Sequence, residues 1–484
     1  MRQLTGIDTS FLAMEGPNTI GHITGVTIVD TSTSPEPWTF ERFRRHLLSR
    51  IERIPIFREK LVEIPFGLDR PYWVPDPHFD IDYHLREIGL PGEGTKEQFA
   101  EQVARIHARP LDRRRPLWEM YVVDRAHGDL RALVTKIHHA AIDGMSGQEI
   151  LATLVDLEPV ITTAADDEDQ ADGAEPHAAP PPGPMPDPLA MATTAAVNLI
   201  TSPVRMTRAA LQLARSMPVL GEALGRSGPT ARGDESTREL VARFGAAPST
   251  PFNKAIGPHR RWSFSSVPLA EVKEVKNAAG TTVNDVILAL VAGVVRTWLA
   301  DNGGIPDRPL SAMVPLSVRS EDQRNAVGNF VSSTVATLAT HIDDPASRLQ
   351  AIHEGMKSAK SQHQALPATL LTDITQMTAP AVTALAARLI ASTKLANRVT
   401  PPFNLVVSNV PGPPVPLYVA GAKMVAQYPV SAIVDGVGLN VTVQSTNENL
   451  DFGFVADRDL VPDLWAMADL VAPTLAELRA AVLS

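Results

Sequence analysis

RALVTKIHHAAIDG, residues 131–144, decides how the rest of this sequence is interpreted. Its first half is apolar and predicts a buried strand that ends in two adjacent histidines, His138 and His139. Side chains alternate along a strand, so both histidines cannot point into one cavity. One is expected to face a reaction site while the other packs behind it. Asp143 follows in a predicted turn, where Gly144 permits an unusual backbone conformation.

Acyl transfer from a thioester to an alcohol needs a base such as one of these histidines, because an alcohol is a weak nucleophile until its proton is removed. An imidazole with a pKa near 6.5 is mostly neutral at pH 7 and can accept that proton. The departing thiolate needs little catalytic help, because a thiol is much more acidic than an alcohol. A reading of both histidines as buried polar groups in a loop stays open.

The sequence does not contain the motifs that other types of reaction would require. Residues 144–147, Gly-Met-Ser-Gly, do not have the spacing of a nucleophile elbow, and there is no phosphate-binding loop or dinucleotide fingerprint. The chain has no cysteine, which excludes disulfides, thiolate metal sites and a cysteine nucleophile. A metal held by His138, His139 and Asp143 is disfavoured, since adjacent strand histidines diverge. We therefore expect no metal and no cofactor.

Composition is that of a globular protein. The 484 residues, 44% hydrophobic and 20% charged, predict two domains of the α/β class. The net charge of -10 becomes about -4 outside residues 166–175, which hold six acids, and this balance does not favour a nucleic-acid partner. No signal peptide is evident, and the longest apolar run, residues 286–295, is too short to span a bilayer.

Periodicity predicts two α/β regions and a connection between them. Strands are expected at residues 21–29, 117–123, 132–137, 310–315, 332–339, 403–408 and 439–444. Helices are expected at residues 40–51, 148–157, 283–299, 379–395 and 464–483. The resulting domains are an N-terminal one at 1–160, a disordered acidic and proline-rich linker at 161–188, a helical connector at 189–250 and a C-terminal one at 251–484.

The connector contains a basic, imperfectly amphipathic segment at residues 189–224. Such helices can lie at a membrane interface, although packing on the body of the protein is the plainer reading. Both readings stay open.

Motifs along nearly the whole chain resemble the bacterial wax ester synthase/acyl-CoA:diacylglycerol acyltransferase family, which is related to chloramphenicol acetyltransferase and to condensation domains. They are LTGIDTSFLAME (4–15), DPHFDIDYHLR (76–86), RPLDRRRPLWEMYVVD (109–124), HHAAIDG (138–144), PFNKAIGPHRRW (251–262), TTVNDVILAL (281–290), VPLSVRSEDQRNAVGNF (314–330) and NLVVSNVPGPPVPLYVAGA (404–422). HHxxxDG alone is shared by several acyl-transfer families, but the combination is specific.

The resemblance implies two chloramphenicol-acetyltransferase-like domains with mixed sheets and an active-site channel between them. It implies that His139 is the base, that His138 is supportive and that Asp143 orients the loop. The expected reaction transfers an acyl group from long-chain acyl-CoA, a co-substrate, to diacylglycerol, giving triacylglycerol, with wax ester synthesis from fatty alcohols as a second activity.

Several further residues are candidates for the site. Asn284 and Asp285 open an apolar helix, where helix capping and support of the site are equally open. Ser408 or Asn409 is a candidate donor to the developing oxyanion, with a plain Pro-Gly turn as the alternative. For the Pro-Leu-Trp segment at 116–118 we favour core packing. Two clusters of arginines could bind the CoA phosphates, although this is the less favoured interpretation. The residues are Arg113, Arg114, Arg115, Arg260 and Arg261.

Two alternatives to the leading function remain. One is acyl transfer to another alcohol or from a carrier-bound donor, and the other is a weakly active lipid-binding protein on droplet surfaces. The protein is expected to be cytoplasmic, with peripheral association to the inner membrane or to lipid droplets.

Overall fold

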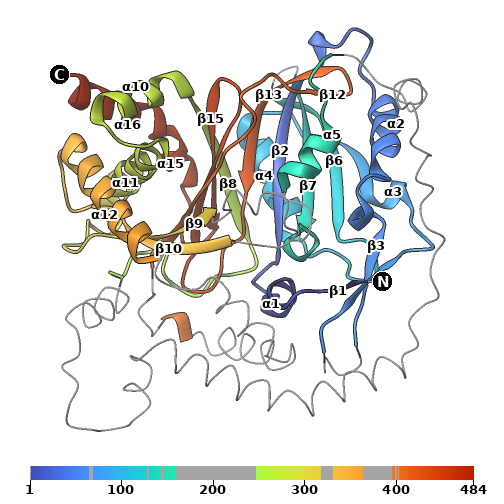
Figure 1. Cartoon of the computed structure of the whole chain (residues 1–484), viewed down its shortest axis with the longest axis horizontal. Helices are drawn as coiled ribbons and strands as arrows, with labels where there is room; N and C mark the ends of the chain where they lie inside the picture. Colours follow the sequence, from blue (N-terminus) through green and yellow to red (C-terminus); the bar gives the residue numbers. More distant parts are fainter. Residues whose placement is uncertain are drawn as a thin grey trace.

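The computed structural model describes residues 2–64, 69–127, 130–142, 147–159, 247–317, 331–363, 395–397, 401 and 403–484. Two six-stranded sheets stand next to each other in this part of the chain (Figure 1). A third, antiparallel sheet has the order β1–β4–β3, formed by Arg2–Gln3, Tyr72–Pro75 and Glu59–Val62. The combination of sheets and helices confirms the predicted α/β class.

The first sheet has the strand order β12–β13–β2–β7–β6–β5. All its neighbours are antiparallel except β5 and β6, and the bounds of its first-half strands are β2 His22–Asp30, β5 Leu85–Gly89, β6 Trp118–His127 and β7 Leu130–His138. The other two, β12 (Tyr418–Val419) and β13 (Ala422–Val430), come from the second half of the chain. A domain boundary at 251 therefore does not separate the two sheets along the sequence.

Helices cover both faces of the first sheet. They are α1 Gly6–Met14, α2 Phe40–Ile51, α3 Ile81–His84, α4 Lys96–Ala108 and α5 Gly147–Leu154, with 3-10 turns at Thr31–Thr33, Pro55–Phe57 and His139–Ile142. Helix α2 begins after Thr39, whose side chain accepts a hydrogen bond from the Arg42 amide, and it buries Phe43 and Leu47. Helix α4 lies between the two large sheets, where Phe99 meets Trp262 edge to face at 5.8 Å.

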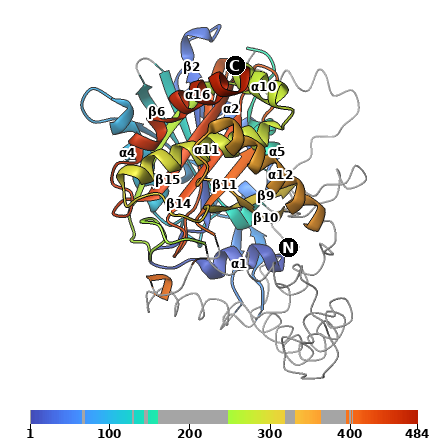
Figure 2. The ribbon, with the colours of Figure 1, turned by 90° about the vertical axis from the view of Figure 1, so that its left-hand side faces the viewer.

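The second sheet has the order β10–β9–β11–β14–β15–β8 and is mixed, because β11 runs parallel to both β9 and β14. Its strands are β8 Arg260–Pro268, β9 Ser311–Ser317, β10 Val331–Thr337, β11 Leu405–Val410, β14 Leu439–Ser445 and β15 Asn449–Asp457. Figure 2 shows helices in front of its outer face. The helices of this half are α10 Leu269–Ala279, α11 Val283–Asp301, α12 Pro345–His363, α15 Leu464–Asp469 and α16 Val471–Leu483, and a 3-10 turn covers Leu395–Asn397.

Helix α11 is long and apolar enough to cross a membrane by length and composition. Most of it is buried, and it contacts α10, α12, α16 and β11 within the largest core cluster. Its apolar character on all sides is that of a helix enclosed by protein.

The predicted strands all form, with ends shifted by a few residues, and so do the helices predicted at 40–51, 148–157 and 283–299. The single helix predicted at 464–483 is wrong, because it is split into α15 and α16 around Leu470. Pro473 explains the split, since its ring clashes with the carbonyl four residues earlier and it has no amide hydrogen to donate. The linker, the basic segment 189–224 and all but the last residue of the helix predicted at 379–395 lie outside the described residues.

Candidate active site

The two histidines of the motif have different surroundings. His138 is the last residue of β7 and is 1% exposed. His139 opens the 3-10 turn His139–Ile142 and is partly exposed. Their main chains are held in different ways, since the His138 amide donates to Leu117 O at 2.9 Å and the His139 amide to Gly21 O at 2.8 Å.

His138 is fixed at both ring nitrogens. The Ala140 amide donates to its Nδ1 at 3.0 Å, so in the neutral ring the proton lies on Nε2. Nε2 donates to Oε1 of Glu15 at 3.2 Å. A histidine with both nitrogens engaged holds its place but has no lone pair free for a substrate, which fits a supporting role for His138.

Glu15 follows α1 and joins several donors. Its Oε1 also accepts from the Gly21 amide at 3.0 Å, and its Oε2 accepts from Nε and Nη2 of Arg113 at 3.1 and 2.7 Å. Burial on its own would raise the pKa of Glu15, but the His138 hydrogen bond and the Arg113 guanidinium outweigh it and hold that pKa at about 2. Glu15 is therefore a carboxylate at neutral pH.

His139 has no such anchor. Its ring stacks on Phe11 of α1, with centroids 4.0 Å apart and planes 11° apart, and its Nδ1 has no hydrogen-bond partner among the described residues. Burial lowers the pKa of His139 to about 4. The imidazole is thus neutral and able to accept a proton across the physiological pH range.

Gly21 makes the close approach of these groups feasible. A Cβ at this position would lie 2.6 Å from His138 Nε2, 2.9 Å from Phe11 O and 3.0 Å from Glu15 Cγ. Gly21, whose amide donates to Glu15 and whose carbonyl accepts from the His139 amide, therefore has no room for a side chain.

Asp143 and Gly144 lie outside the described residues, so their expected roles stay predictions.

Asp285 caps helix α11 in a way that the sequence only half predicted. Thr282 is the N-cap, and Asp285 completes a capping box by accepting from the Thr282 amide at 2.9 Å. Its carboxylate also meets Nδ1 of His353 on α12 at 2.8 Å. Asn284, in the first turn, is partly exposed. Both residues belong to the helical layer of the second sheet, where capping accounts for Asp285.

Ser408 and Asn409 lie on opposite faces of β11, because strand side chains alternate. Ser408 pairs with Thr442 and Asn409 with Val443. Thr442 hydrogen-bonds Ser431, which directly follows β13 of the first sheet, at 2.8 Å, whereas Val443 belongs to the helix-covered core. Ser408 therefore shares the face that turns toward the first sheet, which makes it the stronger of the two candidates.

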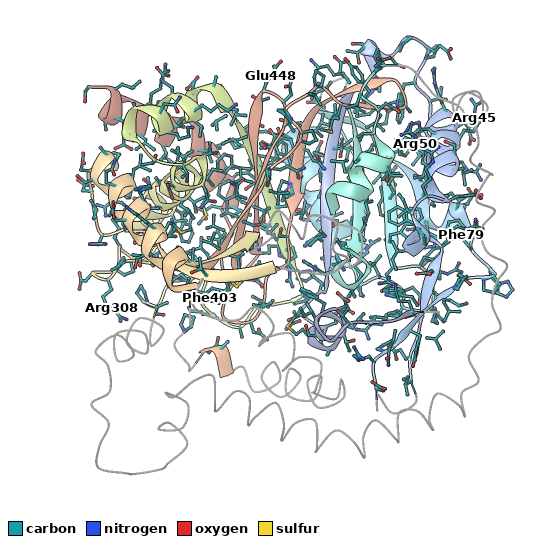
Figure 3. The ribbon with its side chains drawn as sticks, viewed as in Figure 1. Arg45, Arg50, Phe79, Arg308, Phe403 and Glu448 are labelled. Carbon is teal, nitrogen blue, oxygen red and sulfur yellow. The ribbon has the colours of Figure 1, made fainter. Side chains whose placement is uncertain are left out.

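Trp118 belongs to the core, as the favoured reading of the Pro-Leu-Trp segment predicts. It is 1% exposed and donates from Nε1 to Phe57 O at 2.8 Å. Its ring stacks at 4.6 Å on both Phe57 and His84, and Phe79, labelled in Figure 3, lies beside the same stack.

The five candidate arginines differ in the partners that already engage them. Arg113 is engaged by Glu15 and Glu63, and Arg260 is buried among main-chain carbonyls. Arg114 pairs with Asp112, and Arg115 lies over the Tyr83 ring at 3.9 Å. No observation gives Arg261 a ligand-binding role. Among the described residues no group of three or more His, Cys, Asp or Glu could hold a metal ion.

Sequence reasoning missed Glu15 and its pairing with Arg113. Glu15 is 123 residues from His138, and neither hydrophobic periodicity nor motif spacing connects them. The available signal was that Glu15 ends one of the specific segments, LTGIDTSFLAME.

Comparison with known proteins agrees with this picture. Residues 4–287 match the wax ester synthase/diacylglycerol acyltransferase catalytic domain, and residues 327–479 match the C-terminal domain of the same family. A Mycobacterium tuberculosis (strain CDC 1551) protein assigned as a diacylglycerol O-acyltransferase is 36% identical over 479 residues, covering 99% of this chain and 90% of the relative.

Solved structures give the same result. The wax ester synthase/diacylglycerol acyltransferase from Marinobacter aquaeolei is similar with a TM-score of 0.68 and 27% identity over the whole of both chains. The first condensation domain of the CDA synthetase is similar in fold, with a TM-score of 0.53 at 14% identity, covering 100% of this chain and 96% of that one. The relation to condensation domains that the motifs implied is confirmed at the level of fold.

Proposed function

Since the chain belongs to the wax ester synthase/diacylglycerol acyltransferase family and is an acyltransferase, we propose that it transfers a long-chain acyl group from acyl-CoA to the free hydroxyl of diacylglycerol. The products are triacylglycerol and CoA, and a fatty alcohol in place of diacylglycerol gives a wax ester. The observation that carries the proposal is the neutral, partly exposed His139 ring, seated on Phe11 beside the anchored His138.

In the proposed reaction His139 accepts the hydroxyl proton as the acceptor oxygen attacks the thioester carbonyl carbon. The resulting oxyanion takes a hydrogen bond from Ser408, or from Asn409 as the weaker candidate. As the carbonyl re-forms, the carbon–sulfur bond breaks and the CoA thiolate receives the proton from the His139 imidazolium. His138 and Asp143 orient the base without touching substrate. A weak base suffices because the leaving thiolate is much more stable than an alkoxide.

Attack is direct, without an acyl-enzyme. The chain offers no cysteine and no nucleophile elbow. Intersecting initial-rate plots are expected for such a ternary complex. A stoichiometric acyl-protein that forms ester at the catalytic rate, detected by mass spectrometry, would contradict direct attack while leaving the acyltransferase assignment intact.

The two substrates are proposed to reach His139 through a channel between the halves of the chain, acyl-CoA from one side and the lipid alcohol from the other. Since the acceptor is a membrane lipid, we also propose a cytoplasmic enzyme that associates peripherally with the inner membrane or lipid droplets. Co-sedimentation with diacylglycerol-containing vesicles tests this association, and a protein that stays in the supernatant at all lipid concentrations argues against it.

The proposal is tested with radiolabelled acyl-CoA and a panel of alcohols, comparing wild type with His139→Ala and His138→Ala. His139→Ala should lose at least roughly two orders of magnitude in kcat while staying folded, and His138→Ala should lose less. Wild-type rates in both variants would rule out this catalytic arrangement. Ester formation only with other acceptors, or lipid binding without turnover, would replace the proposed function.

A further inference from the structure

One short loop holds both histidines. It runs from Glu15 to Gly21 and is closed by a hydrogen bond from the Gly16 amide to Thr19 O at 3.0 Å. At one end the Glu15 carboxylate accepts from His138, and at the other the Gly21 carbonyl accepts from the His139 amide. Any shift of this loop would therefore move both the His138 and the His139 imidazole.

The middle of the loop is tied to the second half of the chain. Nδ2 of Asn18 donates to Ile256 O at 2.9 Å, and Nη2 of Arg260 donates to Asn18 O. Arg260 begins β8, and Figure 1 shows α1 and the start of β8 at the same end of the two large sheets. These residues are 238 and 242 positions from Asn18 in the sequence.

The second-half side of this contact is built rigidly. Asp435 accepts from the Ile256 amide at 3.0 Å, and Asp457 accepts from the Gly257 amide at 2.7 Å, so the carbonyl that receives Asn18 is fixed from behind. Arg260 is 5% exposed and also donates to Gly257 O at 2.7 Å. Burial lowers the pKa of Arg260 to about 10, although the charges of Asp457 and Asp435 act in the opposite direction.

We propose that Arg260 and Asn18 form a positioning clamp, through which the second half of the chain sets the places of His138 and His139. Through this clamp the second half of the chain would affect the reaction by positioning the histidines, while Arg260 and Asn18 themselves make no contact with substrate. The inference rests on the proposed function in taking His139 as the base. Arg260 is the residue to alter, because its planar fork reaches Asn18 O while still binding the carbonyl of its own segment.

Arg260→Lys keeps the positive charge but removes the planar guanidinium that donates to two carbonyls at once. The chain also offers a closely matched control. Arg348 on α12 is also buried, at 3% exposed, and its Nη1 likewise donates to two main-chain carbonyls, Ile342 O at 2.9 Å and Asp343 O at 3.0 Å. In both arginines Nε has no hydrogen-bond partner among the described residues. Arg348→Lys therefore reproduces the cost of altering a buried guanidinium without touching the loop.

A second pair isolates the amide contact. Asn18→Ala removes the bond to Ile256 O, and Asn302→Ala removes an equivalent bond from Nδ2 to Trp298 O at 2.9 Å, at the end of α11. We expect Arg260→Lys and Asn18→Ala to lose about 10- to 100-fold in kcat with KM changed less than about 2-fold, because misplacement of reacting groups lowers turnover. Arg348→Lys and Asn302→Ala should keep wild-type kcat at a similar loss of Tm.

The pKa of His139, followed by NMR titration of the imidazole, provides a readout that does not depend on turnover. A loosened loop should admit water, and the pKa should rise toward about 6.5 in Arg260→Lys but not in Arg348→Lys. The clamp is overturned if Arg260→Lys matches Arg348→Lys in both kcat and His139 pKa. A wild-type protein that forms no ester would instead remove the proposed function, while the titration would still decide about the clamp.

Discussion

Replacing Gly21 with alanine should displace His138, the neighbour of the proposed base His139, by a distance that the structure specifies. The new Cβ would lie 2.6 Å from His138 Nε2, whereas ordinary contacts begin at 3.4 Å, so the ring would have to retreat by about 0.8 Å (3.4 − 2.6). The other near atoms, Phe11 O and Glu15 Cγ, offer no easier relief, since one is backbone and the other is held by Arg113.

This displacement should lower turnover, because the reacting groups would no longer be correctly placed. A misplacement of about 1 Å can lower turnover on the order of 10²-fold, so we expect Gly21→Ala to lose 10- to 100-fold in kcat. Overpacking should also destabilise the fold by about 1–3 kcal/mol. His138 cannot simply rotate away, because that would leave Glu15 and the Ala140 amide without their partner.

Gly25, in strand β2 that begins directly after Gly21, is the matched control, because its Cβ would meet nothing closer than Gln427 Nε2 at 4.0 Å. Gly25→Ala should keep wild-type kcat and stability, or gain slightly as alanine restricts the unfolded chain. Initial rates at saturating acyl-CoA and diacylglycerol, with thermal melts of the same preparations, make the comparison. Wild-type kcat in Gly21→Ala, or an equal loss in Gly25→Ala, would refute the reasoning.

Three other predictions follow from the site and the linker. Glu15→Gln should lower stability by up to about 3 kcal/mol at neutral pH, the equivalent of a pKa depressed from 4.5 to about 2; this contribution is present above about pH 4.5 and is lost as the pH falls through 2, so denaturant melts of both proteins should converge in acid. The acidic limb of kcat/KM should lie near pH 4, where His139 gains its proton, and a limb near 6.5 would show a solvated ring. Deleting residues 166–175 should leave activity nearly intact, and a collapse of activity would show that this acidic segment is ordered or bound.

Local patterns predicted elements well and long-range partners poorly. The apolar pattern of residues 132–137 predicted β7, because a strand pattern depends only on local sequence, but it did not show that the strand ends at His138 and that His139 begins a 3-10 turn. Glu15 could not be placed against His138, since their contact depends on how α1 packs against the 3-10 turn His139–Ile142. Likewise the sequence pattern predicted capping by Asp285 at the start of α11 but not its partner Thr282, the N-cap residue of the reciprocal capping box.

The sequence pattern could not predict which strands belong to the same sheet. Periodicity marks a strand as half-buried or fully buried but does not say which neighbour it pairs with, so the passage of β13 into the first sheet was not foreseen. The Arg260 side chain shows the same limit, because a basic pair such as Arg260-Arg261 reads as a solvated or phosphate-binding cluster until its burial is known.

The place of β13 also bears on how the chain is made. During synthesis β2 leaves the ribosome some 400 residues before its partner Ala422–Val430, so the first sheet exists for a time with β2 as an open edge. At about 5–20 residues per second that interval is on the order of 20–80 seconds, long enough for an unpaired edge to recruit another chain. Folding of the nascent protein should therefore be completed only when its last tenth emerges, and truncated chains that end before β13 should depend on chaperones to stay in solution.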